Sequence, residues 1–168
     1  AINNLLNKFF PAGFYYKTFM WPKSFWYKIY EPFIRKAAGL GVASIEKDRE
    51  RYEHKFEYCD LLVTGSGPAG LASAYAAAKG GAKVILAEDK HRFGGSLLMD
   101  DVSIDNLSGK DWSDKIISEL KEMPNVTVKN RSQVFGYYDH NMLVMLERTG
   151  DHLEKKPEFT PRQRLWYI

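Results

Sequence analysis

The chain has 168 residues, of which 45% are hydrophobic and 27% are charged, and its formal net charge at neutral pH is +3. This length allows one core that folds without covalent staples, and the single cysteine, Cys59, excludes a disulfide scaffold within the chain. The mild charge does not indicate a nucleic-acid partner, and no apolar run reaches the roughly 18 residues of a membrane span, so we expect a cytoplasmic protein without a membrane partner.

Aromatic residues are concentrated in the N-terminal part of the chain. Aromatics make up 14% of the sequence, and 12 of the 24 lie between Phe9 and Phe33. Residues 1–58 also carry ten Lys or Arg against six Asp or Glu. The sequence therefore predicts a basic, aromatic-rich leader with a linker at its end, covering residues 1–58.

Three prolines in this leader exclude one long helix. We expect one short helix over 25–30 with Ser24 as its N-cap, and a second over 32–38 that ends at the following glycines. A break is predicted at Glu31, because the residue before a proline disfavours helical geometry. The charged segment 44–58 is predicted to be a solvated linker.

Residues 59–168 show the alternating strand and helix pattern of an α/β domain, of which we expect the chain to hold only a part. The apolar runs LLVTG and KVILAED are typical of strands buried on both faces in a parallel sheet, and the alanine-rich PAGLASAYAAAKGG between them predicts a helix. A helix from Trp112 to Met123, introduced by Asp111, then precedes a third strand, VTVK.

The remaining segments predict antiparallel structure. QVFGYY and MLVMLER flank the turn DHN and form a hairpin, and RQRLWYI begins another strand at the end of the chain. The expected fold is a Rossmann-like, three-layer βαβ unit with a β-hairpin or meander, preceded by the short-helical leader. We expect the chain to be a piece of a longer protein, with an unpaired sheet edge at the final strand.

The segment GSGPAG after the first strand carries the binding chemistry. A GxGxxG motif between a buried strand and a helix is typical of dinucleotide binding. Its first glycine allows the tight turn, its second leaves room for a diphosphate, and its third lets the helix pack closely on the strand. The helix offers unpaired backbone N–H groups and the positive end of its dipole to the diphosphate. The predicted diphosphate-binding residues are Gly65, Ser66, Gly67, Pro68, Ala69 and Gly70.

An acid follows the second strand at the distance that ribose binding requires. Glu88 lies 18 residues beyond Gly70, close to the offset of about 20 at which a carboxylate accepts hydrogen bonds from the adenosine ribose. If the three glycines only formed a turn, the position of Glu88 at the end of the second strand would have no explanation. Its charge disfavours the 2′-phosphate of NADP, whereas NAD and FAD stay open because both contain ADP. Asp89 is the neighbouring candidate, expected to point to the opposite side of the strand end.

A second glycine pair follows the acid. We expect Gly94 and Gly95 to approach a diphosphate from its other side, with a hydroxyl contact from Ser96; a flexible surface loop is the alternative. The four histidines have no nucleophile or carboxylate pairing in the sequence, and Cys59 has no CxxC partner. The sequence therefore nominates no catalytic residue and no metal site.

The segment GSGPAGLASAYAAAKGGAKVILAED, followed by FGGSLL, resembles the nucleotide-binding half of flavoproteins with two dinucleotide-binding domains. The leader PAGFYYKTFMWPKSFWYKIYEPFIRKAAGLG, together with RYEH and CDLLVTGSGPAG, is similar to the alpha subunits of heterotetrameric sarcosine oxidases, and related dehydrogenase subunits share parts of it. The resemblance implies a much longer subunit of an oxidative demethylase that converts sarcosine to glycine with oxygen and tetrahydrofolate.

In that family the alpha subunit holds an NAD that does not take part in turnover, and its partners are beta, gamma and delta subunits. The flavins belong to, or border, the beta subunit. An isolated fragment is then expected to be inactive. The resemblance assigns NAD contacts to Gly65, Ser66, Gly67, Gly70, Glu88, Gly94 and Gly95.

Two alternatives stay open. The first is an FAD-binding subunit of a related amine, opine or cyanide-forming dehydrogenase. The second is a non-catalytic module that uses the aromatic leader to dock a partner subunit.

Overall fold

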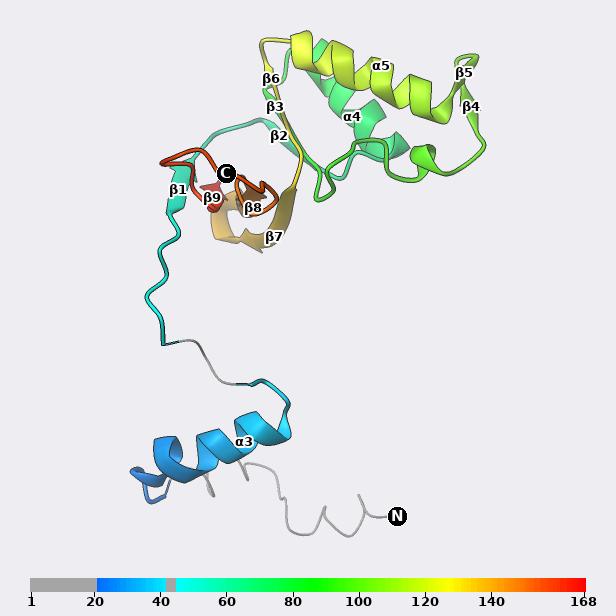
Figure 1. Ribbon diagram of the computed structural model, residues 1–168. Helices are drawn as coiled ribbons and strands as arrows, with labels where there is room; N and C mark the ends of the chain where they lie inside the picture. Colours follow the sequence, from blue (N-terminus) through cyan, green and yellow to red (C-terminus); the bar gives the residue numbers. More distant parts are fainter. Residues whose placement is uncertain (1–20, 42–44) are drawn as a thin grey trace, which may run out of the picture. The chain divides into compact units, whose positions relative to one another are not determined.

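The computed structural model describes residues 21–41 and 45–168, and the chain divides into two compact units, Ala1–Asp48 and Arg49–Ile168 (Figure 1). The first twenty residues, which hold part of the predicted leader, lie outside the described residues. No helix in the described part of the chain is long and apolar enough to cross a membrane, and the expected cytoplasmic location stays a prediction.

One continuous helical stretch, residues 26–37, lies in the described part of the leader. A π-helical turn, Trp26–Tyr30, runs directly into α3, Glu31–Ala37. The predicted break at Glu31 is therefore wrong, since its φ and ψ of −61° and −49° are helical. The Glu31 N–H donates to the carbonyl of Trp26, and this wider π turn accommodates the Pro32 ring inside the helix.

The sequence predicted the C-terminal end of this helical stretch correctly, but not its N-terminal cap. Phe25 occupies the N-cap position without a side-chain cap from any described residue, so the cap predicted at Ser24 is wrong. The predicted glycine stop is confirmed: Gly39 has a φ of +68°, in the left-handed region, and its N–H donates to the carbonyl of Lys36.

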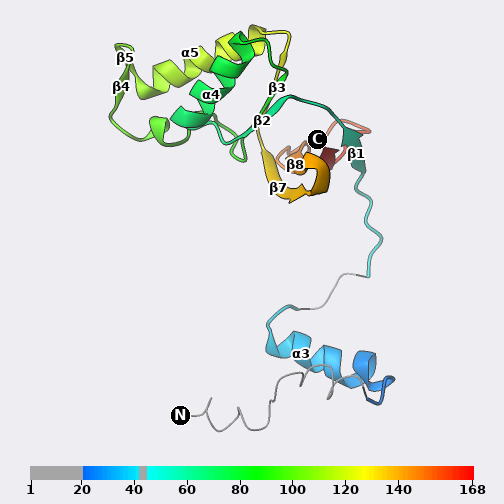
Figure 2. The same ribbon diagram turned by 180° about the vertical axis from the view of Figure 1, so that it is seen from behind.

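The second unit has three layers, confirming the expected fold. The central layer is a parallel sheet in the order β2-β3-β6, formed by β2 (Leu61–Thr64), β3 (Val84–Ala87) and β6 (Val126–Lys129). Helices α4 (Pro68–Lys79) and α5 (Gly109–Glu122) cover one side of it (Figure 2). The other side carries a four-stranded sheet in the order β1-β9-β8-β7.

The four-stranded sheet contains the predicted hairpin. Its strands are β1 (Tyr52–Phe56), β7 (Ser132–Tyr138), β8 (Met142–Arg148) and β9 (Gln163–Tyr167). A short 3-10 turn, Asp139–Asn141, joins β7 to β8 at the predicted position. Between β3 and α5 the chain forms a 3-10 turn, Gly95–Leu98, and a small hairpin of β4 (Ser103–Ile104) and β5 (Leu107–Ser108).

The core lies between the parallel sheet and the two helices. Leu71 of α4, Leu86 of β3 and Leu120 of α5 are completely buried there. Burial of each such side chain contributes roughly 1.5–3 kcal/mol to folding. This core holds the end of β2 and the start of α4 in place, which is where the glycine motif lies.

Helix α5 begins three residues before its predicted start. Ser108 is the N-cap, and its Oγ accepts a hydrogen bond of 3.1 Å from the Asp111 N–H. Asp111 thus lies in the first turn, where its charge stabilises the helix dipole, and is not the cap. The first turn is hidden from a hydrophobic-pattern search because it precedes Trp112, the first large apolar residue.

The sheet edges differ from the prediction. The final strand, β9, pairs in parallel with β1 and antiparallel with β8, so the prediction of an unpaired edge there is wrong. Its partner comes from the predicted linker, whose residues 52–56 form β1. Most side chains of β1 are exposed, so its sequence lacks the apolar signal of a buried strand. Among the described residues β2 pairs only with β3. The prediction that this strand is buried on both faces is therefore wrong.

Candidate functional site

The glycine loop connects the end of β2 to the start of α4. Gly65 has a φ of +91°, which glycine adopts at little cost. Gly67 is the N-cap of α4, where no described side chain caps the helix, and nothing lies within 4 Å of the position that its Cβ would occupy. The approach to the N-terminus of α4 at Gly67 is therefore open, and helix N-termini whose N–H groups lack a cap can bind an anion.

Gly70 has the packing role that its position in the motif predicts. A Cβ on Gly70 would overlap the carbonyl oxygen of Gly65 and would lie 3.5 Å from a methyl group of Val63. Only glycine lets α4 approach the loop this closely. Pro68 and Ala69, between the second and third glycines, are exposed at the start of the helix.

Glu88 follows β3 and is 95% buried. Its Oε2 accepts hydrogen bonds from the Ser66 N–H at 2.8 Å and from the Ser66 hydroxyl at 2.5 Å, and its Oε1 accepts one from the Lys90 N–H at 3.0 Å. Burial raises the pKa of this carboxyl, but the hydrogen bonds from Ser66 and Lys90 outweigh burial and hold the pKa below its ordinary value. The carboxylate is charged at neutral pH and is held against the glycine loop.

Ser66 joins the two predicted glycine segments. Its hydroxyl donates to Glu88 and accepts a hydrogen bond of 3.1 Å from the Gly94 N–H, which also approaches the Ser66 carbonyl at 3.1 Å. The Ser66 side chain is completely buried. It therefore acts within the protein, by connecting the loops and fixing the carboxylate, and presents no hydroxyl at the surface.

The second glycine pair packs against the first loop. Gly94 and Gly95 have φ values of +118° and +53°, and a Cβ on Gly95 would lie 2.9 Å from the Cα of Gly67. Gly94 is buried, which does not fit a flexible surface loop, whereas Ser96 is exposed in the turn that follows. The structure thus brings Gly94 and Gly95 to the glycine loop, and their predicted approach to a diphosphate stays a prediction.

A cavity of about 240 Å³ opens at the carboxyl ends of β2 and β3, where open α/β sheets bind their ligands. Its lining includes Gly65, Ala87, Asp89, Ser132, Gln133 and Val134. Asp89, not Glu88, is the acid that lines it.

Residues 132–134 were missed in the sequence because no motif marks them. They reach the site through the fold, since the Ser132 N–H donates to the carbonyl of Glu88 at 2.8 Å. The hydrophobic alternation of β7 predicts that this segment is a strand, but it does not predict that the strand starts next to Glu88.

A larger cavity, of about 780 Å³, lies near Cys59 and the tip of the β7–β8 hairpin. It shares no residue with the glycine loop, and it opens at the start of β2, the opposite end from the glycine motif. Burial raises the pKa of the Cys59 thiol, so this cysteine is protonated and unreactive at neutral pH. The smaller cavity is the better candidate for a ligand of the motif.

The chain is similar to known oxidoreductases both in the region of the glycine motif and over its whole length. Residues 60–142 match the family described as FAD dependent oxidoreductase. The whole chain is 49% identical to part of the sarcosine oxidase subunit alpha of Rhizobium meliloti (strain 1021), and 78% of it is 35% identical to that of Corynebacterium sp. (strain U-96). The chain spans only 17% and 14% of the lengths of these two curated relatives.

A solved structure supports the fold. L-proline dehydrogenase from P. horikoshii superposes on 74% of this chain, and on 23% of its own, with a TM-score of 0.51 and 16% sequence identity. At this identity the likeness concerns the fold alone. It agrees with a Rossmann-like arrangement of the parallel sheet and its helices.

Proposed function

We propose, from the premise that this chain is homologous to a segment of sarcosine oxidase alpha subunits, that residues 59–168 bind NAD as the nucleotide-binding part of such a subunit. The observation that carries the proposal is the joined arrangement of the glycine loop, the buried acid and the second glycine pair beside an open cavity.

The residues present fit the ADP part of a dinucleotide. Backbone N–H groups at the start of α4 would hold the diphosphate, because Gly67 leaves its approach open. The cavity at the strand ends would hold the adenosine, with Asp89 beside the ribose and the buried Glu88 fixing the glycine loop from behind. Bound NAD would supply a nicotinamide that can accept a hydride, but we propose that NAD has a structural role here, as the resemblance implies.

In the complete protein we propose a multisubunit oxidoreductase that demethylates sarcosine to glycine, using oxygen and tetrahydrofolate. The partners would be beta, gamma and delta subunits of the same type. The names of the matched relatives support a subunit of this enzyme class. The isolated segment would bind nucleotide without turning over substrate.

The test is a titration of the full-length protein with NAD, followed by calorimetry or fluorescence. We expect saturable binding that Glu88→Ala weakens by about tenfold, because Ser66 and the glycine loop lose the carboxylate that fixes them, and hydrogen bonds to a charged group are worth roughly 1.5–3 kcal/mol. Glu122→Ala, which removes an exposed acid at the end of α5, is the matched control. Absence of saturable NAD binding, or equal losses in the two variants, would overturn the proposal.

FAD is the second candidate, favoured by the match of residues 60–142 to an FAD-dependent family. The same glycine loop and acid would hold the ADP part of FAD. The purified full-length protein would then be yellow and release flavin from this segment on denaturation. To separate this flavin from any bound elsewhere, Gly67→Val should lower the flavin content, because a side chain there enters the open space in front of α4.

A further inference from the structure

A second cavity, of about 390 Å³, adjoins the proposed adenosine site. Its lining includes Asp89, Lys90, His91, Arg131, Gln133 and Arg148. Asp89 and Gln133 line both cavities, so the two are neighbours at the end of β3. We refer to this second cavity as the basic pocket.

The charge of the basic pocket is strongly positive. Lys90, Arg131 and Arg148 line it, and Asp89 is the single acid among its lining residues. The Lys90 ammonium lies 3.7 Å from the Asp89 carboxylate, which leaves two guanidinium groups without a carboxylate among the lining residues. Planar guanidinium groups match the oxygens of a phosphate by paired hydrogen bonds.

Backbone contacts assemble the pocket from three segments. The Arg131 N–H donates to the carbonyl of Lys90, and the Arg148 N–H donates to the carbonyl of Arg131, both at 2.9 Å. The Arg148 guanidinium donates to the Asp89 carbonyl at 2.7 Å, which holds that side chain over the pocket. The three basic residues therefore lie together because of the fold.

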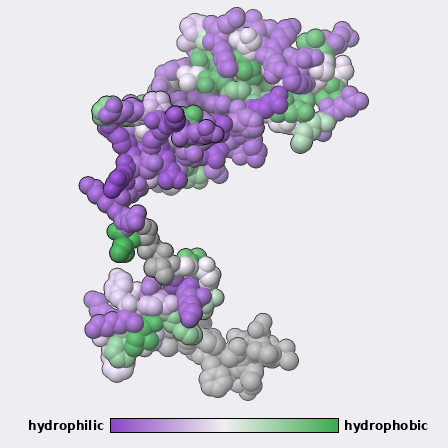
Figure 3. All heavy atoms as spheres, viewed as in Figure 1, coloured by the Kyte–Doolittle hydropathy of each residue, from purple (hydrophilic) through white to green (hydrophobic). Residues whose placement is uncertain are grey.

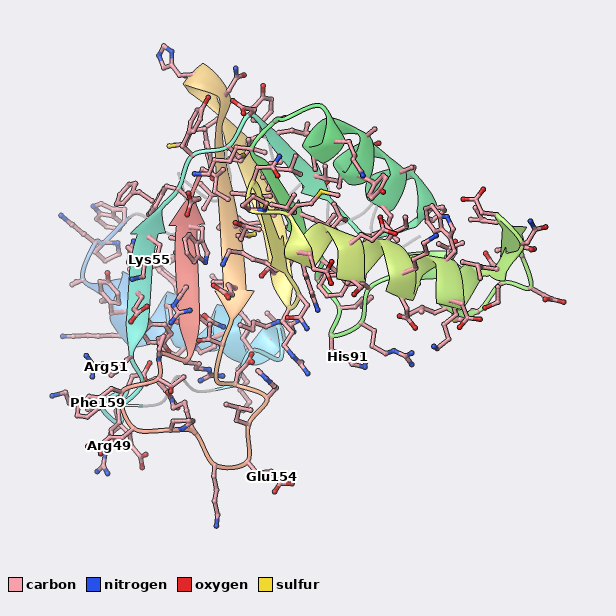
Figure 4. The ribbon with its side chains drawn as sticks, turned by 90° about the horizontal axis from the view of Figure 1, so that it is seen from above. Arg49, Arg51, Lys55, His91, Glu154 and Phe159 are labelled. Carbon is pink, nitrogen blue, oxygen red and sulfur yellow. The ribbon has the colours of Figure 1, made fainter. Side chains whose placement is uncertain are left out.

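This group is separate from the basic residues near the start of the unit. Figure 4 shows His91 beside the parallel sheet and its helices, well apart from Arg49, Arg51 and Lys55. The Arg51 guanidinium there is occupied by the ring of Phe159, 5.3 Å away. The basic pocket is thus separate from the basic residues at the start of the unit.

From the sequence, the charge of Glu88 was expected to disfavour a 2′-phosphate. In the structure that carboxylate is buried, accepts three hydrogen bonds from Ser66 and Lys90, and does not line the basic pocket. Glu88 therefore does not oppose an anion in the basic pocket, where Asp89 is the single lining acid beside Lys90, Arg131 and Arg148.

We propose that the basic pocket binds a phosphate monoester dianion. The phosphate has two possible sources. The first is the 2′-phosphate of a dinucleotide whose adenosine occupies the neighbouring cavity, and this source rests on the proposed function. The second is a free phosphate. Either source presents the same oxygens to Arg131 and Arg148.

The experiment measures binding of three probes to the full-length protein: NAD, NADP and inorganic phosphate. We expect Arg131→Gln to weaken NADP or phosphate binding by about tenfold, because it removes one charge-assisted pair, and to change NAD binding by less than about twofold. Lys90→Gln is a second variant that leaves Arg131 intact. Arg162→Gln, an exposed arginine outside the pocket lining, is the control for loss of charge and should change none of the three.

The outcomes separate this proposal from the previous one. NADP binding that is sensitive to Arg131→Gln supports the ribose-linked source, and sensitive phosphate binding without NADP binding supports the free source. Sensitive phosphate binding without any NAD binding sustains the pocket but overturns the proposed function. NAD binding with no Arg131-sensitive binding of NADP or phosphate overturns the pocket and leaves the proposed function standing.

Discussion

The leader helix and the parallel-sheet unit both contain many apolar side chains, but they place them differently. In the parallel-sheet unit, Leu71 and Leu120 are completely buried. In the leader helix no described residue is buried, and Trp21 before it, Tyr27 and Phe33 are each more than 70% exposed. Figure 3 shows apolar surface on the leader helix, whereas the face of the second unit over the four-stranded sheet is mostly hydrophilic.

The difference shows that a high apolar content does not by itself form a core. A core needs elements that cover one another, as α4 and α5 cover β3. Exposed aromatic residues in a group are typical of a surface that meets a partner. We therefore expect the parallel-sheet unit to contribute most of the stability, and a role of the leader helix in association stays a prediction that the following substitutions test.

The largest effect is expected from Leu120→Ala. Truncation of this completely buried side chain leaves a cavity between α5 and its neighbours and should cost about 2–5 kcal/mol of unfolding free energy. Ile29→Ala, at a half-exposed position of the leader helix, should cost less than about 1 kcal/mol. Denaturant unfolding measures both, and similar losses would show that the division is wrong.

A smaller effect, confined to the glycine loop, is expected from Gly70→Ala. Its Cβ overlaps the Gly65 carbonyl, so the loop or helix must shift at a cost of about 1–3 kcal/mol. Gly67→Ala is the matched variant, because its Cβ meets nothing within 4 Å. It should leave the unfolding free energy within about 0.5 kcal/mol and weaken dinucleotide binding, whereas equal destabilisation by both would argue against the packing role of Gly70.

Ser66→Ala should cost about 1–2 kcal/mol, because Glu88 and the Gly94 N–H each lose a hydrogen bond to the Ser66 hydroxyl. The same change should raise the pKa of Glu88. Ser73→Ala is the control, because it removes a hydroxyl that donates to the Ala69 carbonyl on the exposed side of α4. It should leave the pKa of Glu88 unchanged. Unfolding curves and carboxyl titration by NMR check these outcomes.

The pH dependence of stability tests the same carboxylate. Because the folded-state pKa of Glu88 lies below the ordinary value of 4.5, its contribution is complete above that pH and is lost as the pH falls through the lower, folded-state pKa. We expect the difference in unfolding free energy between the native chain and Glu88→Gln to shrink as the pH falls from about 5 to about 3. This range is roughly that between ordinary and lowered carboxyl pKa values. A constant difference would contradict a charged, hydrogen-bonded Glu88.

The smallest effect on stability is expected in the leader. Trp21→Ala and Phe33→Ala should change the unfolding free energy by less than about 0.5 kcal/mol, since both side chains are largely exposed. In co-expression with a beta-type subunit they should abolish or strongly reduce assembly, whereas Lys23→Ala, also exposed, should not. Normal assembly of both aromatic variants would contradict the predicted docking role of the leader.

Local patterns in the sequence predicted most of the second unit. The apolar runs located β3 and β6, the alanine-rich segment located α4, and the DHN turn located the hairpin. The glycine spacing and Glu88 also identified the loop that the structure builds around Ser66. These features depend on residues close together in the chain, which is why a sequence shows them.

Features that depend on distant partners were not predictable in this way. Strand β1 was assigned to a linker because its charged, exposed side chains show no apolar period, and its pairing with β9 joins segments more than a hundred residues apart. The first strand of the domain, β2, was expected to be covered on both faces, but its apolar run does not say how many neighbours it has.

The sequence by itself determined that this chain contains a glycine loop, an acid at the required distance and an aromatic leader. Only the tertiary structure decided that Ser66 and Glu88 are buried against each other, and that Arg131 and Arg148 meet Lys90 beside them. The physical reason is that backbone periodicity and turn chemistry act over a few residues, whereas burial and charge clustering arise when strands from different parts of the chain are hydrogen-bonded side by side.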